Sequence, residues 1–224
     1  MTATKMSYVV HFICILCVLN TVNLVNGFSK DSACGWTHGC WGNCDGGCSF
    51  LLTWMSYGSS VTFTIKASLT SNADQWAGFG ISTSASMQNA SVTSCLMTNN
   101  SVVFSAENSY NAASGNTNAV VSNPQAGILT IGATYANNIL TCELTRINTN
   151  SDAEVFDLTT DYYILFAKGT LSGGTKNQHT FTDKTDVLVD FQSTQDLTGG
   201  VAIIKPFTSI LFMLNVSQIV LFSM

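Results

Sequence analysis

Apolar and polar residues alternate over short stretches along most of this chain, and this pattern limits the fold more than any other feature. In residues 60–69, Val61, Phe63 and Ile65 alternate with threonine and lysine, so one face of an extended strand is apolar. Similar runs occupy residues 50–56, 76–82, 102–106, 139–147, 162–167 and 186–191. Residues 107–127 are polar and predict a long loop with a weak strand. Short strands separated by turn residues, without a helical period, predict an all-β, immunoglobulin-like antiparallel β-sandwich.

Both ends of the chain look like processing signals. Lys5 precedes an apolar run over residues 8–25 that ends in compact residues, which predicts a secretory signal peptide cleaved near Gly27. Residues 207–224 are mostly apolar and no basic residue follows them, which is typical of a GPI-attachment signal. A single-pass membrane anchor and simple secretion stay open as alternatives. We expect a signal peptide at 1–27, one domain at 28–192, a spacer at 193–206 and a hydrophobic tail at 207–224.

Charge excludes one class of partner. Charged residues make up 9% of the sequence, with 8 basic and 13 acidic side chains and a formal net charge of -5. A nucleic-acid-binding surface needs clustered basic residues to neutralise phosphates, so we expect no nucleic-acid partner. The sequence also contains no glycine-rich phosphate loop and no nucleophile elbow. We therefore expect no enzyme activity from the chain alone.

Cysteine usage indicates an oxidising compartment. Two of the 8 cysteines leave with the predicted signal peptide, and the other six are Cys34, Cys40, Cys44, Cys48, Cys95 and Cys142. Six cysteines in the secretory pathway predict three disulfides, with 15 connectivities open. Cys95 and Cys142 lie in strand-like segments and are a candidate bridge between strands, whereas the cluster around His38 leaves a zinc site as an alternative. Sequons at Asn89 and Asn99 predict a glycoprotein.

Three stretches of the sequence carry a family resemblance. The first is CGWTHGC at residues 34–40, followed by a cysteine pair and the strand FLLTW. The second is QWAGFGIS at residues 75–82, followed by Met87. The third comprises LTCELTR at 140–146, DYYILFAKG at 161–169 and finally His179. In order and spacing these stretches resemble the DOMON family, and most closely its branch related to ferric-chelate reductases.

The resemblance implies a cofactor. In haem-binding DOMON domains, a methionine after the Trp-to-Gly strand and a histidine after the late Tyr-rich strand bind the iron axially, and Met87 and His179 match those positions. A thioether and an imidazole would fill both axial positions of a b-type haem and suit electron transfer. Apart from the resemblance, Met87 reads as an ordinary loop methionine and His179 as a solvated loop histidine.

Two further residues are cofactor-binding candidates through the same resemblance. Trp76 would lie against the ligand, although its bulk also suits the core. Arg146 would bind a haem propionate, and the alternative is that it pairs with a buried carboxylate such as Asp157 or Asp161.

The resemblance implies an extracellular, haem-binding electron-transfer or redox-sensing domain at the cell surface. In relatives similar to ferric-chelate reductases, a multi-helix membrane cytochrome follows this domain, so we expect reductase activity to need a membrane redox partner. DOMON domains also bind other small molecules, which leaves a sugar-, catechol- or sterol-binding module as an alternative. An adhesive surface protein is the third hypothesis, because fold alone does not decide function.

Overall fold

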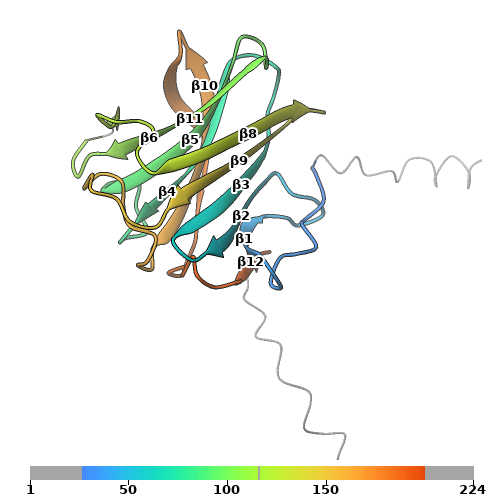
Figure 1. The fold of residues 1–224 in the computed structure, drawn as a ribbon. Coiled ribbons are helices and arrows are strands. Elements are labelled where there is room, and N and C mark those ends of the chain that lie inside the picture. The colour runs from blue at the N-terminus through green and yellow to red at the C-terminus, as the bar shows by residue number, and fades with distance from the viewer. Residues whose placement is uncertain (1–26, 116, 200–224) are drawn as a thin grey trace, which may run out of the picture.

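The chain folds into two six-stranded sheets that pack face to face (Figure 1). The computed structural model describes residues 27–115 and 117–199. In the first sheet the strand order is β12-β1-β2-β3-β9-β8, with β1 (Gly39–Asn43), β2 (Phe50–Tyr57), β3 (Ser60–Ser68), β8 (Ile128–Ala136), β9 (Ile139–Ile147) and β12 (Asp196–Thr198). In the second sheet it is β11-β10-β4-β5-β6-β7, with β4 (Gln75–Ser82), β5 (Ala90–Thr98), β6 (Val103–Asn111), β7 (Asn118–Val120), β10 (Tyr163–Ser172) and β11 (Thr175–Lys184).

This architecture confirms the predicted β-sandwich. Neighbouring strands pair antiparallel, except that β12 pairs parallel with β1.

The signal peptide expected at residues 1–27 and the tail expected at 207–224 fall almost entirely outside the described residues, and β12 lies within the segment predicted as a spacer. No helix of membrane-spanning length and apolarity occurs in the part of the chain that the structure describes.

Alternating side chains fill the space between the sheets. In β3 every second residue is buried, as expected for a strand with one face in the core. Aromatic rings bridge the layers, since Phe50 stacks on Phe166 with ring centroids 4.1 Å apart and Phe63 lies 4.6 Å from Phe79. In β4, by contrast, all eight residues are buried, so the outer face of this central strand is covered as well.

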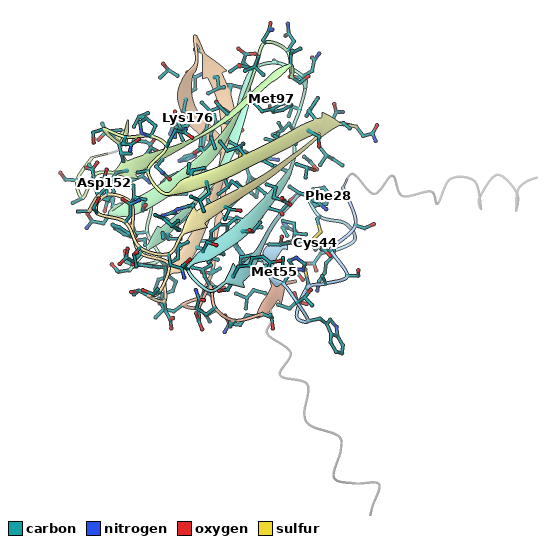
Figure 2. The ribbon with its side chains drawn as sticks, in the orientation of Figure 1. Phe28, Cys44, Met55, Met97, Asp152 and Lys176 are labelled. Atoms are coloured by element: carbon teal, nitrogen blue, oxygen red, sulfur yellow. A yellow bond between two sulfur atoms is a disulfide. The ribbon has the colours of Figure 1, made fainter. Side chains whose placement is uncertain are left out.

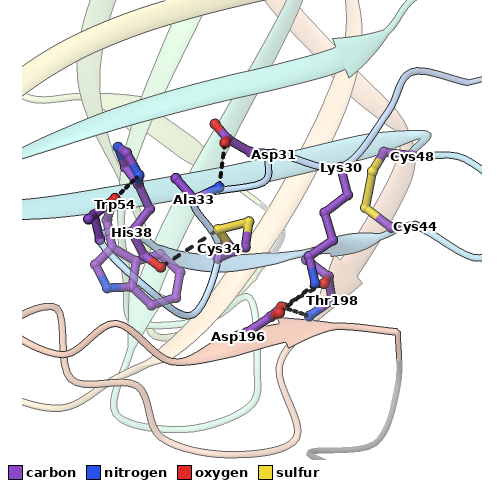
Figure 3. The surroundings of a disulfide bond; sticks show 12 residues. Lys30, Asp31, Ala33, Cys34, His38, Cys44, Cys48, Trp54, Asp196 and Thr198 are labelled. Carbon is purple, nitrogen blue, oxygen red and sulfur yellow. Dashed lines mark hydrogen bonds and ion pairs between the residues drawn. A yellow bond between two sulfur atoms is a disulfide. The ribbon is translucent and has the colours of Figure 1, made fainter.

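Six cysteines form three disulfides, which confirms the predicted number. Cys95 on β5 and Cys142 on β9 join the two sheets, as expected for this pair. The other bonds are Cys34–Cys40 and Cys44–Cys48, so these four cysteines hold each other rather than zinc. Figure 3 shows the two short-range disulfides beside an ion pair between Lys30 and Asp196. Three disulfides in a domain of this kind point to a secreted or surface location.

One strand prediction was wrong, and one loop prediction was right only in part. Residues 186–191 do not form a strand: Val189 makes only an isolated bridge to Tyr162, because this irregular segment buries Val189 and Phe191 against the end of the core. Within residues 107–127, predicted as a long loop with a weak strand, β7 is such a strand, but residues 107–111 continue β6. Their polar residues are tolerated in a strand because Asn108, fully buried, accepts a hydrogen bond from Thr93 and donates one to the carbonyl oxygen of residue 126.

Candidate functional site

A cleft of about 720 Å³ lies on the outer face of the second sheet. Its floor comes from β4, where Trp76, Gly78 and Gly80 face outward while the alternate residues Ala77 and Phe79 face the core. Strands β5, β6, β7, β10 and β11, the loops between β4 and β5 and between β6 and β7, and the turn between β10 and β11 supply the rest of the lining. A volume of this size falls within the range of about 300–1,000 Å³ that is usual for small-molecule sites.

The two floor glycines keep the cleft open. A Cβ atom at Gly78 would come within 2.7 Å of the Thr93 carbonyl oxygen and of Ser94 Oγ, so the sheet itself requires glycine there. A Cβ atom at Gly80 would lie 3.3 Å from Val92 Cγ2, which is tight but less severe. Without side chains at these positions, a flat ligand could approach the β4 backbone closely.

Met87 lines the cleft from the loop at residues 83–89, between β4 and β5, and is half-buried. Two hydrogen bonds fasten this loop. Asn111 Nδ2 of β6 donates to the Met87 carbonyl oxygen at 2.7 Å, and Lys184 Nζ of β11 donates to the Ala85 carbonyl oxygen at 3.1 Å. The loop is therefore attached to both sides of the cleft.

His179 lies on β11 and also lines the cleft, with its side chain exposed. Opposite residues in an antiparallel pair project to the same face. Phe181 pairs with Lys168 on the core side, whereas His179 pairs with Gly169, which is opposite Trp76 on the outer side. A register shift between these pairs leaves one extra residue on β11. In a regular strand His179 would share the face of Phe181, so this β-bulge turns it towards the cleft.

Trp76 is almost fully buried in the floor and packs with Leu96 and Leu171. Its indole Nε1 is buried and has no hydrogen-bond partner among the described residues. A Cβ atom at Gly169 would come within 2.9 Å of this nitrogen, so the absence of a side chain there lets β10 pack directly on the indole. A buried indole N–H without a partner is costly, and here it lies against the β10 backbone rather than open to the cleft.

The structure does not bring Arg146 to the cleft. This residue is 1% exposed and lies between the sheets, where Nη1 donates to Thr93 Oγ1 at 3.2 Å and Nη2 donates to the Phe156 carbonyl oxygen at 3.0 Å. Burial lowers the pKa of Arg146 to about 10, opposed by the charges of Tyr162 and Asp157. No ion pair joins Arg146 to a carboxylate within the described ranges. The guanidinium therefore makes its hydrogen bonds inside the sandwich and does not line the cleft, so the structure gives no support to the predicted contact with a propionate.

Sequence reasoning missed the two charged residues of the cleft. Lys176 of β11 and Glu107 of β6 both line it, and Lys176 Nζ lies 3.0 Å from Glu107 Oε1. Figure 2 labels Lys176 among the strands of the second sheet. Neither residue belongs to a recognisable motif, and residues 107–127 read as loop, so no sequence signal could have paired them. No cluster of three or more His, Cys, Asp or Glu side chains suited to a metal ion occurs in the described part of the chain.

Comparisons with known proteins add a family and one distant structural likeness. The sequence model of the DOMON domain matches residues 46–169, more than half of the chain. A search of curated proteins finds no match. Among solved structures, the cytochrome domain of Myriococcum thermophilum cellobiose dehydrogenase is similar over 64% of this chain and 76% of that chain, with 10% identity and a TM-score of 0.49. At that distance, the likeness says nothing about the ligand of this chain.

Proposed function

This chain belongs to the DOMON family, and from that premise we propose that its outer cleft binds a b-type haem for electron transfer or redox sensing. The observation that carries the proposal is that Met87 and His179, far apart in the sequence, line one cleft of small-molecule size. Trp76, the third residue expected at the ligand, lines the same cleft.

The lining fits a haem in two respects. The floor has no side chains at Gly78 and Gly80, which suits a flat ring. The two expected iron ligands, the Met87 thioether and the His179 imidazole, are a soft and a borderline donor that favour reduced iron. Met87 and His179 would hold the haem, and the group would supply one-electron chemistry when bound.

The protein's own part is to hold these donors in place. Asn111 and Lys184 fasten the loop that carries Met87, and pairing with Gly169 between two register shifts fixes the direction of His179. A ligand that is held by preorganised side chains costs less reorganisation when its charge changes by one electron.

We further propose that the domain acts at the cell surface, attached through residues 207–224 by a GPI anchor or a membrane span. The side chains of Asn89 and Asn99 are exposed, as N-glycosylation requires. In this proposal the chain is not an enzyme alone, and a membrane redox partner supplies or accepts the electron.

Absorption spectroscopy of the full-length protein tests the haem proposal. We expect a sharp Soret band, a reduced α-band and a low-spin spectrum. Replacing Met87 by Leu or His179 by Ala should each convert low-spin haem to high-spin, because one axial ligand is lost. Met55→Leu and His38→Ala, which lie outside the cleft lining, are matched controls and should leave the spectrum unchanged. An unchanged low-spin spectrum in both the Met87 and the His179 variant would reject this ligand pair.

A second candidate function has its own observation. Five residues that carry side-chain amides line the same cleft as Trp76, namely Gln88, Asn111, Asn118, Asn177 and Gln178. Amides and an aromatic ring are suited to a polyhydroxylated ligand such as a sugar. A colourless protein that takes up no added haem, but that binds an oligosaccharide in isothermal calorimetry, would favour this function over the first.

A further inference from the structure

Lys176 reaches across the second sheet. Its Nζ atom lies 3.0 Å from Glu107 Oε1 and donates to Ser109 Oγ at 2.9 Å and to Ser94 Oγ at 3.3 Å. The same ammonium sits 5.7 Å from the centroid of the Trp76 ring. These partners belong to β4, β5 and β6, whereas Lys176 itself belongs to β11 at the edge of the sheet.

The distances show that the hairpin of β10 and β11 must fold over the sheet. Strand order places β10, β4 and β5 between β11 and β6. At about 4.8 Å between neighbouring strands, a flat sheet would separate β11 from β6 by about 19 Å, far beyond the reach of a lysine side chain. The backbone near Lys176 therefore lies above the outer face rather than in the plane of the sheet.

Local sequence permits this bend. Pairing of β10 with β4 ends at Thr170, so residues 171–176, here called the hairpin tip, extend past β4. Gly173 and Gly174 turn the tip with φ values of 58° and 81°, which glycine adopts without steric strain. A second register shift, between Gly169 and Leu171, bends the strand further. The hairpin curves at this end in Figure 1.

The ammonium of Lys176 binds other residues of the second sheet rather than a ligand. The Lys176 side chain is only 10% exposed, and Glu107 and the two serine hydroxyls account for its three N–H donors. Burial lowers the pKa of Lys176, and the charge and hydrogen bond of Glu107 oppose that shift. A solvated surface lysine would not have this environment.

We propose that Lys176 is a positioning residue that fastens the hairpin tip across the outer face and so fixes His179 at the rim of the cleft. His179 lies three residues after Lys176 on the same strand, and the close packing of β11 on Gly169 is its second point of attachment. Only the consequence for haem rests on the proposed function, because the attachment itself is a property of the ligand-free chain.

Hydrogen exchange of the full-length, ligand-free protein tests the attachment. In Lys176→Met, which keeps the apolar stem, amides of the hairpin tip should exchange about tenfold faster, as expected when a charge-assisted hydrogen bond is lost. Glu107→Gln should speed the same amides by a smaller factor, and the double variant should be no faster than Lys176→Met, because both substitutions break one interaction. Lys66→Met, on β3 of the other sheet, is the matched control and should leave the tip unchanged.

Unchanged exchange of the tip in folded Lys176→Met would overturn the proposal. Should that variant fail to fold, the Glu107→Gln comparison decides in the same way. If the wild-type protein takes up haem, Lys176→Met should bind it about tenfold more weakly while keeping the low-spin spectrum, since both iron ligands remain. If the wild-type protein takes up none, the haem function fails but the exchange result still decides whether Lys176 holds the hairpin.

Discussion

Removing the disulfide between the sheets should destabilise the domain more than removing either short-range disulfide. Cys95 and Cys142 are both buried, and their bond ties β5 of the second sheet to β9 of the first. The perturbation is the double substitution Cys95→Ala/Cys142→Ala, which removes the bond without leaving a free thiol. A cross-link restricts the unfolded chain more as the loop it closes becomes longer.

The loop lengths set the expected free energies of unfolding. The Cys95–Cys142 bond closes a separation of 47 residues, for which the chain-entropy relation gives about 4 kcal/mol at 25 °C. Cys34–Cys40 closes 6 residues and Cys44–Cys48 closes 4, which gives about 2 kcal/mol for each bond. The two core sulfur atoms also leave a small void when replaced by alanine, and that effect adds to the loss in the same direction.

Urea unfolding followed by circular dichroism measures the difference. Relative to wild type, Cys95→Ala/Cys142→Ala should lose about twice the free energy that Cys34→Ala/Cys40→Ala loses. The m-value should also rise, because an unfolded chain without the long cross-link exposes more surface. Equal losses in the two double variants would refute the loop-entropy reasoning.

Two further predictions concern packing and acid. Gly78→Ala should lower stability by about 1–3 kcal/mol because its methyl group would lie 2.7 Å from a β5 carbonyl oxygen. Gly132→Ala is the control and should leave stability unchanged, because no atom lies within 4 Å of the added methyl group. Thermal unfolding of the two variants measures the difference. Burial raises the pKa of Asp196, but hydrogen bonds from Lys30 and Thr198 outweigh burial, and the net pKa lies below its ordinary 3.8. The stabilisation by the Asp196 carboxylate is therefore present above pH 3.8 and is lost as pH falls through the lowered pKa. Hydrogen-exchange protection of β12 should drop in that pH range in the wild-type protein but not in Asp196→Asn. Equal pH dependence in the two proteins would contradict this.

The fold could be predicted where side chains obey the simple division between core and solvent. In β3, Val61, Phe63 and Ile65 are all fully buried and the residues between them are not, so the alternation in the sequence is the alternation in the structure. The Cys95–Cys142 bridge was predictable for the same reason, since both cysteines lie in recognisable strands. Met87 and His179 came from the family resemblance, and their shared cleft agrees with that prediction without testing the iron.

Prediction failed where polar residues are satisfied inside the protein. Asn108 and Arg146 are buried, yet each finds hydrogen-bond partners that lie far away in the sequence. Such partners exist only once the two sheets have packed, so single-sequence alternation cannot reveal them. The same limit hid the pair of Lys176 and Glu107, which join strands at opposite sides of the cleft.

The polar strand β11 shows how a site can depend on irregular backbone. Its sequence, TKNQHTFTDK, lacks a clear alternation because two register shifts interrupt its pairing with β10. Without the register shift between Lys168 and Gly169, Thr180 would occupy the outer position opposite Gly169. His179 would then share the inward face of Phe181. The register shifts that hide this strand in the sequence therefore also turn His179 towards the cleft that Met87 lines. It follows that a search for such sites in related chains should count residues between the Tyr-rich strand and the histidine, because one residue more or fewer reverses the face.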